Sequence, residues 1–184
     1  MKVFVELTWT EMRIAGEIAV LWQVQNIMER KRPAYGAPEG EAGWMPYTTM
    51  AECAVAKHFN LFWMGNCGDR DAVDVGKLIE VRSCTRQTDC LILHPPTPKR
   101  PNKDPPHLPY VLVYPDPPIF SLLGWCWGYE GKQDQHWADL QGTARWAYFV
   151  KQKFLREIEE LENVIPRLLR EQREQLRQQQ QQVA

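Results

Sequence analysis

The segment from Asp74 to Arg82 holds the residues of this chain that are best suited to chemistry. Asp74 and Glu80 are acidic, and the basic Arg82 follows Glu80 by two positions in an otherwise apolar stretch. On a β-strand, Glu80 and Arg82 point to one face while Ile79 and Val81 point to the other. Mg²⁺ prefers oxygen ligands from one or two carboxylates together with phosphate and water. The segment therefore predicts a metal site, with Asp74 and Glu80 as ligands and Arg82 placed to hold a phosphate.

The direction of Asp74 depends on the loop that joins the two predicted strands of this segment. Because side chains alternate along a strand, Asp74 shares a face with Glu80 only if the loop has an odd number of residues. We predict a three-residue loop over 75–77, which places Asp74 opposite Leu78. A two-residue turn over 76–77 would instead direct Asp74 to the opposite face. A solvated hairpin with ordinary surface charges is the alternative interpretation.

Two N-terminal helices are predicted ahead of this segment. Residues 10–30 have apolar side chains at helical spacing, with Thr10 as the N-cap. A second helix is predicted from Met50 to about Phe59, because Thr49 to Glu52 has the form of a capping box.

Glu52, in this second helix, is a candidate third acid of the site. Its alternative role is structural, since a capping box uses its last residue to bond the helix start. Lys57 on the same helix is a candidate contact for a nucleic-acid phosphate, and an ordinary exposed lysine is the alternative.

Strands follow the two helices. Apolar and β-branched residues predict them over 72–75, 78–83, 90–93, 110–114, 119–127 and 148–150. The strand 110–114 is almost entirely apolar, so we expect it to lie inside the sheet and to be covered on both faces. The order of elements predicts an α/β or α+β domain, with a mixed central sheet of four to five strands flanked by the N-terminal helices.

Residues 94–109 contain seven prolines and predict an extended loop. Its basic residues Lys99, Arg100 and Lys103 are candidates to follow a nucleic-acid backbone. His94, at its start, is either a general base or a strand-end residue with a local hydrogen bond.

The last part of the chain has a different composition. Residues 151–175 predict a charged amphipathic helix, which Pro166 should kink or split, and the terminal glutamines predict a disordered tail. We therefore predict a domain over 1–150 and an extension over 151–184, through which the chain could form a homo-oligomer or bind a protein partner.

Composition limits the classes of function. The 184 residues carry a formal net charge of −1, so any binding of nucleic acid must use a local patch. Five cysteines without a CxxC pair favour reduced thiols in a cytoplasm. No apolar run approaches the roughly 20 residues that span a bilayer, so we expect no membrane association.

The chain resembles the PD-(D/E)XK nuclease superfamily, in a form similar to small bacteriophage and prophage proteins. The segments that carry the resemblance are 11–20, 51–57, 74–82, 110–113, 124–128 and 147–150. The resemblance implies Mg²⁺- or Mn²⁺-dependent hydrolysis of DNA, with Glu52, Asp74, Glu80 and Arg82 as catalytic residues. It also implies a bacterial host cytoplasm as the location.

Arg82 departs from this superfamily, which usually has lysine at that position. Arginine stays protonated and cannot act as a general base, although it can hold a phosphate while a metal supplies hydroxide. A catalytically inactive nuclease fold that binds DNA or a protein is therefore the alternative function.

Overall fold

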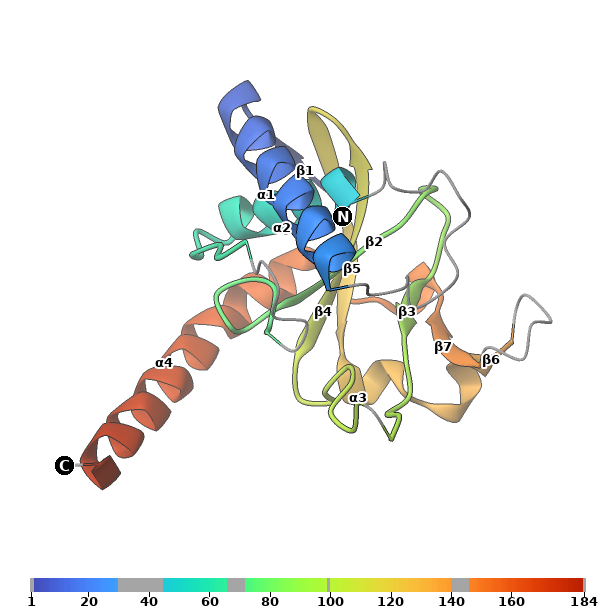
Figure 1. Cartoon of the computed structure of the whole chain (residues 1–184). Coiled ribbons are helices and arrows are strands. Elements are labelled where there is room, and N and C mark those ends of the chain that lie inside the picture. Colours follow the sequence, from blue (N-terminus) through green and yellow to red (C-terminus); the bar gives the residue numbers. More distant parts are fainter. Residues whose placement is uncertain (1, 30–44, 66–71, 99, 140–145, 184) are drawn as a thin grey trace.

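The structure is a computed structural model that describes residues 2–29, 45–65, 72–98, 100–139 and 146–183 (Figure 1). Its elements are β1 (Val3–Glu6), α1 (Trp9–Met28), α2 (Met45–His58), β2 (Glu80–Ser83), β3 (Leu91–Leu93), β4 (Pro109–Asp116), β5 (Ile119–Trp127), α3 (Gly128–Gly131), β6 (Trp137–Ala138), β7 (Ala147–Val150) and α4 (Ile158–Val183), with short 3-10 turns η2 (Asp134–His136) and η3 (Gln152–Phe154). The predicted α+β class is confirmed.

A mixed four-stranded sheet with the order β1-β5-β4-β2 forms the centre of the molecule. The strands β1 and β4 run antiparallel to β5, whereas the edge strand β2 runs parallel to β4. Nearly all of β4 is buried, as predicted for an internal strand. A second sheet with the order β3-β7-β6 packs against one face through the cluster that includes Leu91, Leu112 and Val150.

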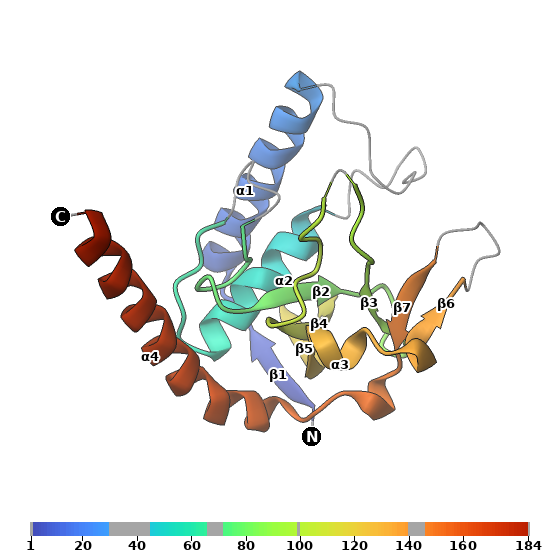
Figure 2. The same cartoon turned by 90° about the horizontal axis from the view of Figure 1, so that it is seen from below.

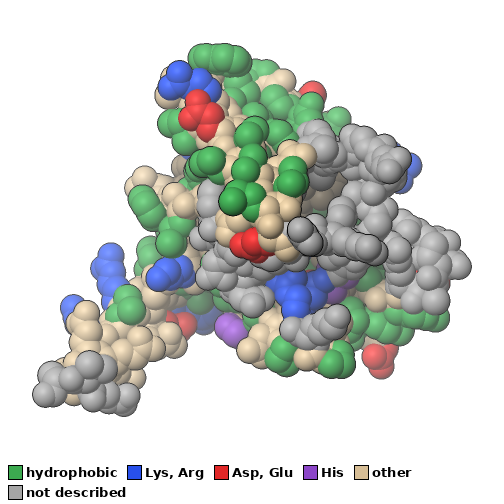
Figure 3. All heavy atoms as spheres, viewed as in Figure 1, with side chains coloured by type: hydrophobic (Ala, Val, Ile, Leu, Met, Phe, Trp, Pro, Cys, Tyr) green, Lys and Arg blue, Asp and Glu red, His purple; other side chains and the backbone are tan. Residues whose placement is uncertain are grey.

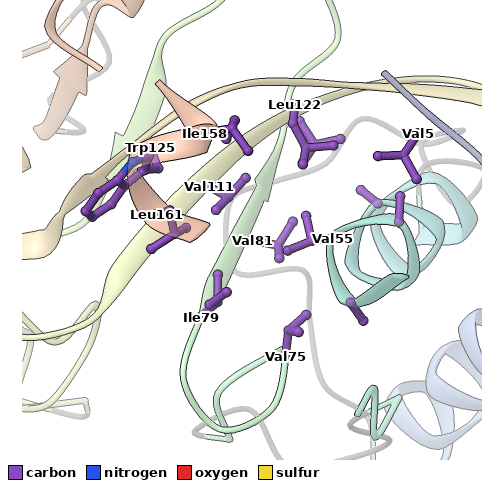
Figure 4. Packing of buried hydrophobic residues seen from close by; sticks show 14 of the residues in the cluster. Val5, Val55, Val75, Ile79, Val81, Val111, Leu122, Trp125, Ile158 and Leu161 are labelled. Atoms are coloured by element: carbon purple, nitrogen blue, oxygen red, sulfur yellow. The ribbon is translucent and has the colours of Figure 1, made fainter. Parts of the chain in front are cut away.

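The other face of the four-stranded sheet is covered by α2 and by the first turns of α4. Helix α2 packs on the strands and α1 packs on α2 (Figures 1 and 2). Figure 4 shows Val55 of α2 and Val81 of β2 meeting in this core, with Ile158 and Leu161 of α4 beside Trp125. The indole nitrogen of Trp125 also donates to the carbonyl oxygen of Glu157 at 2.9 Å. The start of the C-terminal extension is therefore part of the main core.

Both N-terminal helices begin earlier than predicted, and β1 was not predicted. Thr8, not Thr10, caps α1, because its hydroxyl accepts from the Glu11 amide at 3.3 Å while the Glu11 carboxylate accepts from the Thr8 amide at 2.6 Å. Helix α2 begins at Met45, so the predicted capping box at its start is wrong. Within α2, the Thr49 hydroxyl lies 2.9 Å from the carbonyl oxygen of Ala15 and packs the helix on α1.

Two further predictions are wrong. Residues 72–75 form a turn rather than a strand, and only Val75 makes bridges, to Trp63 and Ile79. Helix α4 continues through Pro166 to Val183, so proline does not split it and the glutamines are helical. The buried Leu161 and Ile165 hold this helix against the core, and glutamine itself has good helix propensity. Across the described ranges, no helix has the length and apolar character needed to cross a membrane.

Candidate active site

The hairpin around Gly76 sets the direction of Asp74. Val75 pairs with Ile79, and its amide donates to the Ile79 carbonyl oxygen at 3.0 Å, which leaves a three-residue loop over 76–78. Gly76 adopts a φ of 59°, the left-handed region that glycine enters without strain. The loop has the predicted odd length but lies one residue later, so Asp74 stands across from Glu80 rather than Leu78.

Asp74 is fixed by a hydrogen bond to the edge of the sheet. Its Oδ2 accepts from the backbone amide of Val81 at 2.8 Å. Among the strands that the structure describes, β2 has a neighbour only on its β4 side, so its outer edge offers backbone donors. This bond brings Asp74 Oδ2 to 3.8 Å from Nη1 of Arg82.

Arg82 lies at the centre of an ion-pair network. Its Nη1 donates to Glu80 Oε2 at 3.0 Å, and its Nη2 donates to Asp104 Oδ1 at 2.7 Å. The guanidinium carbon lies 5.2 Å from the centre of the Tyr110 ring, a cation–π distance. Glu80 and Arg82 thus share one face of β2, as predicted, while Ile79 and Val81 enter the helix-covered core.

Glu52 reaches the same region from α2. Its Oε2 accepts from the indole nitrogen of Trp63 at 3.1 Å. Glu52 is in the interior of α2, so the structural alternative, a capping role, does not apply. Burial, with a smaller contribution from the charge of Glu80, raises the pKa of its carboxyl to about 7, while the Trp63 hydrogen bond and the charge of Arg82 oppose the increase.

The three acids act on one another electrostatically. Burial, together with the charge of a neighbouring carboxylate, raises the pKa of Asp74 and of Glu80 to about 7 each. The carboxylate that acts on Asp74 is that of Glu52, and the carboxylate that acts on Glu80 is that of Asp74. Carboxylates that repel one another in this way are stabilised by a bound cation.

The donor set fits a hard divalent metal ion. Asp74 and Glu80 offer carboxylate oxygens on the same side of the hairpin, and Mg²⁺ needs only one or two carboxylates when phosphate and water complete its shell. Within the described ranges, no three His, Cys, Asp or Glu side chains are arranged as ligands of one metal ion. A metal here would therefore depend on ligands from substrate and solvent.

The predicted nucleic-acid residues do not lie together. Lys57 Nζ donates to the Glu6 carbonyl oxygen at 2.9 Å and to Glu11 Oε2 at 2.8 Å, which ties α2 to the start of the chain. Arg100 and Lys103 lie instead in the proline-rich loop that carries Asp104. Lys99 is outside the described residues.

Sequence reasoning missed two residues near this site, Asp104 and Lys132. Asp104 is 6% exposed, and it accepts from Arg82 and from the His94 amide. Burial raises the pKa of the Asp104 carboxyl, but the Arg82 charge and the His94 amide outweigh this and hold it below its ordinary value. An acid among prolines is typical of a loop, and no spacing in the sequence relates it to Arg82.

Comparisons with known proteins do not identify the chain: no family model, no curated protein and no solved structure matches it.

Proposed function

We propose that this protein is a metal-dependent nuclease of the PD-(D/E)XK type that hydrolyses phosphodiester bonds of DNA. The observation that carries the proposal is that the charge of one guanidinium, that of Arg82, acts on three half-buried carboxyls. Glu52, Asp74 and Glu80 come from a helix, a turn and a strand, and each influences the ionisation of another. Such a group of acids costs stability when ionised, so a structural role does not account for it.

Each residue of the site has a separate role in this proposal. Asp74 and Glu80 would hold Mg²⁺ or Mn²⁺, which supplies a hydroxide nucleophile and neutralises charge on the phosphate. Glu52, with a pKa of about 7, is suited to accept a proton from the attacking water. Arg82 remains protonated, so it holds the phosphate and stabilises the charge that develops on it.

The test is a cleavage assay on plasmid and oligonucleotide DNA with Mg²⁺ or Mn²⁺. We expect Asp74→Asn and Glu80→Gln each to reduce the rate by at least about 100-fold, because loss of a ligand removes several kcal/mol of metal stabilisation. Asp116→Asn, which changes an exposed acid at the end of β4, is the matched control and should cleave as the natural chain does. Equal activity in all four proteins would refute the proposal.

A second candidate is a catalytically inactive nuclease fold that binds DNA or a protein. The hydrogen bonds of Arg82 to both Glu80 and Asp104 favour it, because they satisfy the guanidinium without substrate. Calorimetric titration with Mn²⁺ separates the candidates: binding in the micromolar range that Asp74→Asn abolishes favours the nuclease. The mass of the protein in solution tests whether α4 mediates assembly. It is measured for the chain that keeps residues 151–184 and for a chain from which only residues 176–184 are removed.

A further inference from the structure

Three aromatic side chains gather on one face of the β6–β7 pair. Trp137 of β6 pairs with Tyr148 of β7, and Trp146 lies two positions before Tyr148, so the three side chains share a face. The rings of Trp137 and Trp146 stack with their centres 5.8 Å apart, and the Tyr148 ring lies 4.7 Å from that of Trp137. Figures 1 and 2 show these strands at the side of the molecule far from the end of α4, and Figure 3 shows hydrophobic side chains at the surface on that side.

The two tryptophan rings are open to solvent. Trp146 is 51% exposed and Trp137 is 38% exposed, although tryptophan is on average largely buried in proteins. Aromatic pairs across neighbouring strands stabilise a hairpin, and this role accounts for the contact between the two rings. It does not account for the ring area that faces solvent. Exposed aromatic surface of this kind is typical of a site that receives a flat or apolar ligand.

The second sheet connects this aromatic surface with the candidate active site. Strand β3 pairs with β7, which pairs with β6. His94, at the end of β3, donates its amide to Asp104, which accepts from Arg82. Neighbouring strands are about 4.8 Å apart, so about 10 Å separates β3 from β6. The rings therefore lie two strands away from the ion-pair network of Arg82.

Lys153 places a positive charge close to the start of β6. Its Nζ lies 4.9 Å from the centre of the Phe154 ring, and that ring lies 5.1 Å from the ring of His136, the residue before Trp137. Lys153 is exposed, so its ammonium group can contact a phosphate. Aromatic rings that stack bases, together with cations that follow the backbone, are the means by which proteins bind single-stranded nucleic acid.

We infer that Trp137, Trp146 and Tyr148 form a surface on which unpaired bases of single-stranded DNA stack, with Lys153 as a contact for a backbone phosphate. The choice of DNA as the ligand rests on the proposed function. Every base has a π-face, so stacking on these rings needs no particular sequence. The substrate of the proposed nuclease is then DNA with a single-stranded segment, which lies on β6 and β7 while Arg82 holds the phosphate under attack.

The test measures binding of a fluorescein-labelled thymidine oligonucleotide of about 12 nucleotides, in EDTA to prevent cleavage, over a range of salt concentrations. Trp146→Leu keeps an apolar partner for Trp137 but removes the stacking face. It should weaken binding about 5- to 100-fold, the effect of losing one aromatic partner of a base. The slope of log K against log salt should stay the same, because stacking releases no counterion.

Three further variants make the measurement specific. Lys153→Gln should lower the magnitude of the salt slope by about 0.7, because one phosphate contact on a single strand releases about 0.7 counterion. Trp146→Phe keeps an aromatic face and should keep most of the affinity. Trp9→Leu changes a tryptophan of α1 that is 75% exposed, and as the matched control it should bind as the natural chain does.

Several outcomes would overturn the inference. These are natural affinity in Trp146→Leu, an equal loss in Trp9→Leu, an unchanged salt slope in Lys153→Gln, or binding of a duplex of the same length as tightly as the single strand. Thermal unfolding of Trp146→Leu checks that a loss of binding is not a loss of folding, and Lys153→Gln tests the surface without a change in the hairpin.

Failure of the two proposals is distinguishable. Cleavage that needs Asp74 but proceeds equally on duplex and single strand, and equally in Trp146→Leu, refutes the aromatic surface alone. Binding of the single strand that needs Trp146, without any cleavage, refutes the nuclease alone.

Discussion

Asp104 accepts a 2.7 Å hydrogen bond from the guanidinium of Arg82, although 22 positions separate the two residues in the sequence. Asp104 sits in the proline-rich loop with a φ of 51°, and its second oxygen accepts from the His94 amide at 2.6 Å. Bonds of this kind, in which one partner is charged, are about twice as strong as neutral ones. The pair therefore attaches the loop to β2 and sets where the positive charge of Arg82 lies relative to Glu80.

A double-mutant cycle should show that this pair is strongly coupled. We expect Arg82→Met to cost about 3 kcal/mol of unfolding free energy, because it leaves Asp104 buried without its counter-ion. Combined with Asp104→Asn, it should give a coupling energy of about 1–3 kcal/mol in urea unfolding. The Arg86–Asp89 pair is the control: the Arg86 side chain is 79% exposed, so its coupling should be at most about 0.5 kcal/mol. Equal coupling in the two pairs would contradict the prediction.

The raised pKa values of the three acids predict that the metal-free protein becomes more stable as the pH falls. Burial raises the pKa of Glu52, Asp74 and Glu80 to about 7, whereas the unfolded chain has values of about 4. Between about pH 4 and 7 the folded state therefore binds more protons than the unfolded state, so the unfolding free energy rises as pH decreases through this window.

Urea unfolding in EDTA at about pH 8 and about pH 5.5 measures this change. Burial lowers the pKa values of His94 and His136. Below about pH 6.5 these two histidines therefore decrease the unfolding free energy as the pH falls, which opposes the effect of the acids. The comparison is therefore with Asp74→Asn/Glu80→Gln, which should gain less stability on acidification than the natural chain. The same pH dependence in both proteins would contradict the raised pKa values of Asp74 and Glu80.

Gly128 should tolerate no side chain, because a Cβ there would lie 2.5 Å from the Pro105 carbonyl oxygen and 2.9 Å from Pro106 Cα. Gly128→Ala would displace the backbone next to Asp104, and we expect a loss of about 1–3 kcal/mol in thermal or urea unfolding. Gly16→Ala is the matched control, since its Cβ would meet only the flexible end of Met50 at 3.7 Å. In the interior of α1 this change should stabilise the protein by about 0.5–1 kcal/mol. A neutral Gly128→Ala would contradict the contact.

Truncation should separate the two ends of α4. Removal of residues 158–184 takes away the buried Ile158, Leu161 and Ile165, each worth about 1.5–3 kcal/mol, so the remaining chain should not fold stably. Removal of residues 176–184 should change the unfolding free energy by less than about 0.5 kcal/mol, because residues 176–181 are exposed. Circular dichroism during heating measures both. A cooperative, unshifted transition in the longer truncation would refute the role of α4 in the core.

The sequence predicted the faces of individual strands well, but it predicted the contacts between separate elements less well. The alternation of Ile79, Glu80, Val81 and Arg82 correctly gave the two faces of β2, and the apolar run of β4 correctly gave an internal strand. The start of α2 was wrong because Thr49 lies inside the helix, where its hydroxyl donates to the carbonyl oxygens of Ala15 in α1 and of Pro46 rather than capping a helix start. The contact with Ala15 joins two helices, and no pattern within one helix reveals it.

The sequence by itself determined which side chains share a face, since the two-residue period of a strand is a property of the local backbone. It also predicted an odd loop length, but the structure decided that the loop spans 76–78 and that Asp74 stands across from Glu80. Only the tertiary structure decided that Glu52 approaches these acids from α2, that Asp104 holds Arg82, and that Lys132 lies beside Lys103. These contacts join residues distant in the chain, and they depend on how β2 pairs with β4 and how the proline-rich loop folds back over the sheet.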